Sequence, residues 1–155
     1  MSAADFRNIA VIGAGTMGSG IAAQIANAGH DVLLLDLGAK SVGEKIPAEN
    51  AIDRLLASDP PQLMSKKNVA RITTGVIDDD FEKLADCDWI IEAVVERLDI
   101  KKALYRRLDA VIGANCIVSS NTSTIPIKLL VEDMPTAFRQ CFAVTHYFNP
   151  VRYMR

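Results

Sequence analysis

A glycine-rich segment near the amino terminus has the pattern of a phosphate-binding turn. It reads Gly13-Ala14-Gly15-Thr16-Met17-Gly18, a GxGxxG motif that directly follows the apolar run Ile9–Ile12. In such a turn the first glycine permits the tight bend and the second lets the backbone approach a pyrophosphate. The third lets the following helix pack against the strand. Because N–H groups and the helix dipole at a helix start favour anions, the segment predicts a dinucleotide-binding loop.

An acidic residue stands where a dinucleotide site needs one. Asp36 lies 18 positions after Gly18, at the end of the next apolar run. A carboxylate there accepts hydrogen bonds from the adenosine ribose and repels a 2′-phosphate, which favours NAD over NADP. Lys40 could weaken this preference if its side chain turns toward the ribose. Two simpler interpretations are a plain strand-to-helix turn and an aspartate that merely ends a strand, and the joint presence of strand, helix and acid argues against both.

A histidine and a polar turn follow two later apolar runs. His146 comes just after Cys141–Val144, and six polar residues, Ser119–Thr124, follow Ile117–Val118. Ligands of an open parallel sheet bind beyond the carboxyl ends of its strands, so both segments are expected to face the cofactor crevice. Imidazole changes charge near neutral pH and suits general base catalysis. A structural histidine fits equally well, whereas helix capping explains only one of the six polar residues.

Two acidic residues and a lysine adjoin another apolar run, Trp89–Ile91. Glu92 and Glu96 follow this run, and Lys101 lies on the next predicted helix. Acidic side chains are favourable near a helix start, so these residues fit a solvated helix start. A contact with a bound cofactor fits them as well.

The apolar runs predict an α/β fold. Near-continuous runs at Ile9–Ile12, Val32–Leu35, Trp89–Ile91 and Ile117–Val118, with a weaker one at Cys141–Val144, indicate strands covered on both faces of a parallel sheet. A helix between the first two runs has one apolar face, formed by Met17, Ile21, Ile25 and Ala28. A second, between the third and fourth runs, has a face formed by Ile100, Leu104, Leu108 and Val111. This succession predicts a Rossmann-type, doubly wound, mainly parallel sheet in one domain over residues 1–155.

The segment from Gly38 to Arg71 is less regular. Val42–Leu56 has the composition of a helix, which must end before Asp59-Pro60-Pro61 because proline lacks an N–H donor and restricts its predecessor. Gln62–Val69 is expected to be a short helix or a loop.

Composition narrows the class of protein. The 155 residues are 50% hydrophobic with a net charge of -2, so the chain can bury a sizeable core but lacks the basic surface that nucleic acid binding requires. Its three cysteines form no CxxC pair, which argues against disulfides or a zinc site and favours a cytoplasmic location. No apolar stretch approaches the roughly 18 residues of a membrane span.

Taken together, these motifs resemble the amino-terminal domain of the L-3-hydroxyacyl-CoA dehydrogenase family, including the dehydrogenase part of fatty-acid-oxidation multienzymes. The matching pieces are IAVIGAGTMGSGIA, Asp36, IIEAVVERLDIKKALYRRLD, SSNTSTIPI and THYFNPVRYM, in the family's order along almost the whole chain. The resemblance implies oxidation of an L-3-hydroxyacyl-CoA to a 3-ketoacyl-CoA, with NAD as cofactor and an acyl-CoA as partner.

The resemblance also implies residue roles. His146 would remove the hydroxyl proton, and Ser123 would hydrogen-bond the substrate oxygen near the nicotinamide. Asn149 would help to fix the nicotinamide end and the substrate. Glu96 and Lys101 would contact the nicotinamide half of the cofactor. The positions that contact CoA are not carried over.

The chain departs from the family in two respects. Val144 and Tyr147 replace the family's glycine and a phenylalanine around the histidine. The glutamate that pairs with this histidine, and the helical carboxy-terminal domain through which the family dimerises, would lie beyond Arg155. We therefore expect NAD binding with weak or no turnover, an exposed apolar patch, and a monomeric or weakly associated chain.

Two alternative functions remain from the sequence. One is another β-hydroxyacid dehydrogenase, of the type that uses a lysine base on a following helix. The other is an NAD-binding sensor or structural relative that has lost turnover.

Overall fold

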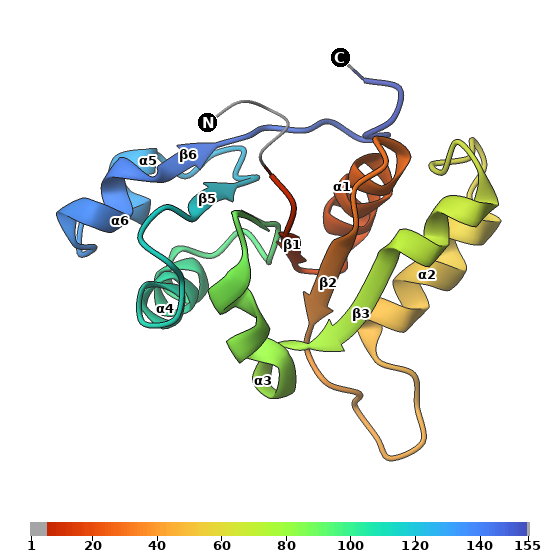
Figure 1. The fold of residues 1–155 in the computed structure, drawn as a ribbon, viewed down its shortest axis with the longest axis horizontal. Coiled ribbons are helices and arrows are strands. Elements are labelled where there is room, and N and C mark those ends of the chain that lie inside the picture. The colour runs from red at the N-terminus through yellow and green to blue at the C-terminus, as the bar shows by residue number, and fades with distance from the viewer. Residues whose placement is uncertain (1–5, 155) are drawn as a thin grey trace.

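The computed structural model describes residues 6–154 and contains one six-stranded sheet (Figure 1). Every neighbouring pair of strands is parallel, in the order β3-β2-β1-β4-β5-β6. The strands are β1 (Ile9–Ile12), β2 (Val32–Asp36), β3 (Ile72–Val76), β4 (Trp89–Glu92), β5 (Ile117–Ser120) and β6 (Phe142–Val144). The chain begins in the middle of the sheet and winds first to one edge and then to the other, which confirms the predicted doubly wound fold.

Helices cover both faces of the sheet. They are α1 (Thr16–Asn27), α2 (Pro47–Ala57), α3 (Ile77–Asp80), α4 (Leu98–Asp109), α5 (Ile127–Leu130) and α6 (Thr136–Gln140), with 3₁₀ helices at Lys66–Arg71 and Phe81–Asp86. Strand β1 is buried on both sides: Val11 packs in the cluster of α1 and α2, and Ile12 packs in the cluster of α4 and α6. Within residues 6–154, no helix combines the length and apolarity needed to cross a bilayer.

One strand was not predicted. Strand β3 pairs with β2 at the edge of the sheet, where Thr73 is exposed and the apolar signal is weak. It also contains Gly75, a residue type depleted in strands. The glycine leaves room for two neighbouring side chains, because a Cβ atom there would lie 2.4 Å from the Asp80 carboxylate and 2.8 Å from the Leu35 side chain. An edge strand with polar and glycine residues gives little periodicity to detect.

The helix predicted over Val42–Leu56 begins later than expected. Helix α2 starts at Pro47, and the preceding Gly43 has a φ of +86°, which a right-handed helix cannot contain. Proline is favoured in the first helical turn because its missing N–H would have no partner there. The Glu49 carboxylate accepts the Ile46 N–H at 3.1 Å and completes this start. The expected short helix or loop at Gln62–Val69 is a loop leading into the 3₁₀ helix Lys66–Arg71.

The segment after β6, residues 145–154, runs from the β6 edge of the sheet to helix α1 (Figure 1) and is called the crossing segment below. The Tyr147 N–H donates to Asn121 Oδ1 at 2.8 Å, just beyond the carboxyl end of β5. Val151 then packs on α1, so closely that a Cβ atom on Gly20 would lie 2.9 Å from its Cγ2 atom. Arg152 and Tyr153 donate to the Pro61 carbonyl oxygen, both at 2.8 Å. The segment is therefore anchored at β5, at α1 and at the loop after α2.

Candidate cofactor and active site

The glycine loop joins β1 to α1 in the form that the motif predicted. Gly13 has a φ of +105°, and its N–H donates to the Leu35 carbonyl oxygen at 2.7 Å. A Cβ atom on Gly13 would lie 2.5 Å from the Ala93 oxygen, and one on Gly18 would lie 1.7 Å from the Gly13 oxygen. A Cβ atom on Gly15 would meet nothing within 4 Å. The outer glycines are thus required by the protein's own packing, whereas Gly15 adjoins open space.

The start of α1 is available to a ligand. Gly15 is its N-cap residue, and no side chain caps the helix. Thr16 is exposed and Met17 is half-buried, while Ala14 is buried. N–H groups in an uncapped first helical turn attract anions, especially together with the helix dipole.

Asp36 lies at the carboxyl end of β2, directly beside the loop. Its Oδ2 atom accepts the Ala14 N–H, and its Oδ1 atom accepts the Leu37 N–H at 2.7 Å. Arg54 from α2 donates to the Ala14 carbonyl oxygen at 2.7 Å. The loop is therefore held from β2 and from α2, and sequence reasoning missed the second contact because it joins residues 40 positions apart.

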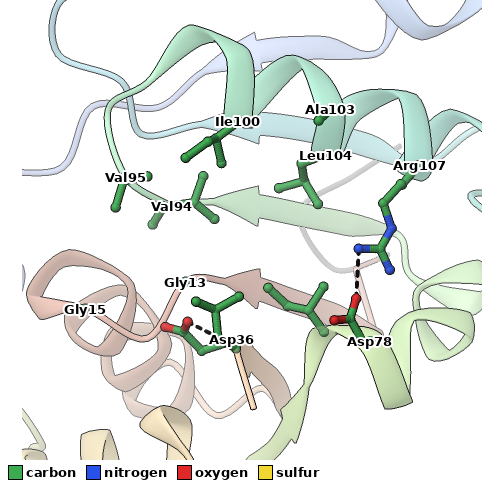
Figure 2. Close-up of a pocket in the computed structure, with 13 residues that line it drawn as sticks. Gly13, Gly15, Asp36, Asp78, Val94, Val95, Ile100, Ala103, Leu104 and Arg107 are labelled. Carbon is green, nitrogen blue, oxygen red and sulfur yellow. Dashed lines mark hydrogen bonds and ion pairs between the residues drawn. The ribbon is translucent and has the colours of Figure 1, made fainter. Parts of the chain in front are cut away.

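A cavity of about 510 Å³ opens between the glycine loop and α4 (Figure 2). Gly13, Gly15 and Asp36 line one side of it, and Val94, Ile100 and Leu104 line the opposite side. Asp78 and Arg107 add a charged pair at one end, with 3.0 Å between carboxylate oxygen and guanidinium nitrogen. The cavity lies where β1 and β4 diverge into helices on opposite faces, the position at which doubly wound sheets bind ligands.

The acidic residue at the end of β4 is not part of a solvated helix start. Glu92 is fully buried and accepts hydrogen bonds from Lys101 Nζ, Tyr105 Oη and Ser120 Oγ, each at 2.6 Å, and from the Val94 N–H at 2.8 Å. Burial raises the pKa of the Tyr105 phenol, which keeps it a donor. Lys101 is 1% exposed and also lies 3.3 Å from Glu96 Oε2. This cluster joins β4, α4 and β5 through charged hydrogen bonds.

Glu96 organises the polar turn after β5. Its Oε1 atom accepts the Thr122 hydroxyl, the Ser123 N–H at 3.0 Å and the Thr124 N–H at 3.2 Å. Burial alone would raise the pKa of Glu96, but these hydrogen bonds and the Lys101 charge outweigh it and place the pKa at about 2. Glu96 is therefore ionised at neutral pH and fixes the backbone of Ser123.

The sequence suggested that all six polar residues, Ser119–Thr124, face one crevice, and this expectation was wrong. Ser119 and Ser120 belong to β5 and are buried, with Ser119 Oγ accepting Trp89 Nε1 and Thr145 Oγ1, both at 3.0 Å. Thr122 is also buried, whereas Ser123 is exposed. The expected strand end at Val118 was two residues short, because serines paired by side-chain hydrogen bonds are accommodated inside the sheet.

His146 lies on the crossing segment, two residues after the end of β6. Its exposed imidazole lies beside the Phe148 ring, with 4.5 Å between ring centroids and an angle of 34° between the ring planes. Asn149 is exposed on the same segment. Neither residue lines the 510 Å³ cavity. The Tyr147 contact with Asn121 brings the segment beside the turn that contains Ser123.

Comparisons with known proteins agree with this geometry. A family model described as 3-hydroxyacyl-CoA dehydrogenase, NAD binding domain, matches residues 8–155. A curated relative, the probable 3-hydroxyacyl-CoA dehydrogenase of Deinococcus radiodurans, is 40% identical over 96% of this chain and 43% of its own length. This chain spans only 21% and 43% of the length of the first two curated relatives that it matches.

Two solved structures have the same fold. The crystal structure of 3-hydroxybutyryl-CoA dehydrogenase from Escherichia coli K12 matches with a TM-score of 0.79 and 34% identity, over 97% of this chain and 31% of that one. The (S)-3-hydroxybutyryl-CoA dehydrogenase of Ralstonia eutropha matches with a TM-score of 0.74 and 31% identity, over 97% of this chain and 52% of that one.

Proposed function

Because the chain belongs to the family of 3-hydroxyacyl-CoA dehydrogenase NAD-binding domains, we propose that it supplies the cofactor site and the catalytic base for NAD-dependent oxidation of an L-3-hydroxyacyl-CoA to a 3-ketoacyl-CoA, a step of fatty acid β-oxidation. The observation that best supports this proposal is the course of the crossing segment. It starts at β6, contacts Asn121 and packs on Gly20 of α1, which puts His146 on a segment that joins the polar turn to the helix of the glycine loop.

The residues present fit NAD. The open space beside Gly15 and the uncapped start of α1 suit a pyrophosphate. Asp36 lies within the same cavity and would take the hydroxyls of the adenosine ribose. When bound, NAD supplies the acceptor for the hydride that leaves C3 of the hydroxyacyl group.

The proton chemistry would fall to His146. An exposed imidazole can accept the hydroxyl proton as the C3 hydride departs, and can return it to the carbonyl oxygen in the reverse direction. Ser123 would donate its hydroxyl to the substrate oxygen, and Asn149 would orient the substrate and the nicotinamide end. The contacts of Glu96 support this role, because they fix the Ser123 backbone.

Glu96 and Lys101 would act at the nicotinamide half in different ways. Glu96 has a partly exposed carboxylate that can meet the cofactor directly, whereas the buried Lys101 ammonium would act through Glu96. The same burial disfavours Lys101 as the lysine base of the alternative function, because its side chain is 1% exposed and its ammonium is paired with two carboxylates.

The two histidines allow a matched test. His146→Ala should leave the NADH dissociation constant unchanged and lower kcat by at least about 100-fold, the contribution expected of a general base. His30→Ala, in the turn between α1 and β2, should change neither quantity. NADH binding is measured by fluorescence titration of the chain, and turnover of a 3-ketoacyl-CoA is measured in the full-length gene product. An H146A protein with wild-type kcat would contradict the assignment of the base.

A further inference from the structure

The cavity beside the glycine loop has apolar walls and few polar groups. Val94, Val95, Ile100 and Leu104 form the wall on the α4 side. Of its charged residues, Asp36 already accepts two backbone N–H groups. Asp78 and Arg107 are charged residues of the lining that contact each other across one end (Figure 2). A ligand that enters this end meets a carboxylate and a guanidinium side by side.

The ion pair between these residues can be exchanged for ligand contacts. The side chains of Arg107 and Asp78 are 47% and 77% exposed, and exposed ion pairs contribute little stability. Arg107 is nevertheless held in place, because its guanidinium lies 4.2 Å from the centroid of the Phe81 ring. The site thus offers a positioned hydrogen-bond donor beside an acceptor, at low cost for opening the pair.

We propose that Asp78 and Arg107 recognise the edge of the adenine base of NAD. The inference rests on the proposed placement of the dinucleotide, with Asp36 at the adenosine ribose. The apolar walls would cover the faces of the purine. Adenine carries an amino group at N6, which would donate to the Asp78 carboxylate, and an acceptor at N1, which would receive a hydrogen bond from Arg107.

Recognition of this edge by Asp78 and Arg107 would make the site selective for adenine over hypoxanthine. Hypoxanthine carries an oxygen at position 6 and an N–H at N1, so it would place an acceptor against Asp78 and a donor against Arg107. Sites built to hydrogen-bond a group reject analogues that leave their own polar groups unpaired. The discrimination should be moderate, because both side chains keep contact with water.

The test compares NADH with its hypoxanthine analogue, reduced nicotinamide hypoxanthine dinucleotide, by fluorescence titration. The wild-type chain should bind NADH about tenfold more tightly than the analogue, because one hydrogen bond to a charged group contributes about this much to binding. Asp78→Asn should reduce this ratio to about twofold or less, because an amide can also donate to the oxygen of hypoxanthine. Arg107→Ala should weaken NADH binding by about tenfold.

Arg106→Ala is the matched control. Arg106 precedes Arg107 on α4 but lies 3.3 Å from Asp133, and it does not line the cavity. This variant should keep the wild-type affinities. If Arg107→Ala fails to fold without its Phe81 contact, Asp78→Asn decides, because the exposed Asp78 side chain contributes little packing.

Equal affinity of the wild type for both dinucleotides would overturn the proposal, as would unchanged discrimination in Asp78→Asn. A wild-type chain that binds neither dinucleotide would instead refute the cofactor placement on which the proposal rests. Tight NADH binding without selectivity leaves that placement intact, so the two failures are distinguishable.

Discussion

The ionised state of Glu96 should make the stability of this domain depend on acid pH in a way that one substitution removes. Its pKa falls from 4.5 to about 2 in the folded chain, despite burial, because of hydrogen bonds from Thr122, Thr124 and Ser123 and the charge of Lys101. At about 1.4 kcal/mol per pKa unit this shift corresponds to about 3.5 kcal/mol. The side chain is 37% exposed, so screening by water reduces the expected contribution to about 1–2 kcal/mol.

The direction of the pH effect follows from the lowered pKa. The unfolded chain binds the proton first, so the stabilisation is fully present above the unfolded pKa of 4.5 and is lost as the pH falls through about 2. Glu96→Gln has no carboxylate to titrate. Its free energy of unfolding should therefore lie about 1–2 kcal/mol below that of the wild type at pH 7, with the difference falling to less than about half of this at pH 3.

Urea unfolding followed by circular dichroism at pH 7, 5, 4 and 3 measures this difference directly. Glu82→Gln is the control, because Glu82 is exposed on the 3₁₀ helix Phe81–Asp86, and it should match the wild type at each pH. If the free energy of unfolding of Glu96→Gln lies below that of the wild type by the same amount from pH 7 to pH 3, the reasoning is refuted. The loss of stability would then come from altered packing and not from the missing carboxylate charge.

Four further predictions concern two glycines of the loop, the cofactor preference and the thiols. Gly18→Ala should destabilise the fold by about 3 kcal/mol or more in urea unfolding, because its Cβ atom would lie 1.7 Å from a backbone oxygen. Gly15→Ala should keep the wild-type unfolding midpoint but weaken NADH binding by about tenfold, because its methyl group would occupy the space of the pyrophosphate. Asp36→Asn should lower the ratio of the NADPH dissociation constant to the NADH dissociation constant, because it removes the negative charge that repels a 2′-phosphate. Burial raises the pKa of the Cys87 and Cys116 thiols to about 11 and 12, so an aromatic disulfide reagent at pH 8 should modify them only after unfolding.

The cofactor loop was predictable because its signal is local. A strand, a glycine turn and a helix follow one another within Ile9–Asn27, so the whole unit can be recognised from one short stretch of sequence. Asp36 was predictable from its distance along one βαβ unit. Strand β3 was not, because its position at the sheet edge allows the exposed Thr73, and because its glycine makes room for the Asp80 side chain, a contact that leaves no periodicity in the sequence.

The cluster around Glu92 shows where sequence reasoning reaches its physical limit. A glutamate after an apolar run resembles a solvated helix start, because the free energy that decides its burial depends on partners supplied by other elements. Lys101 and Tyr105 lie one and two helical turns into α4, and Ser120 is on β5, so the partners converge only when β4 and β5 pair. An unpaired buried carboxylate would be strongly destabilising, whereas this one has four donors.

The same convergence ties the fold to the site. Lys101 bridges Glu92 in the core to Glu96, and Glu96 holds the backbone N–H groups of Ser123 and Thr124. A buried ion pair often adds little net stability compared with apolar packing, yet it fixes the geometry of the groups that it joins. The polar turn therefore takes its position from a charge pair beneath it, which explains why a domain with so apolar a core places two carboxylates and an ammonium at the carboxyl end of a central strand.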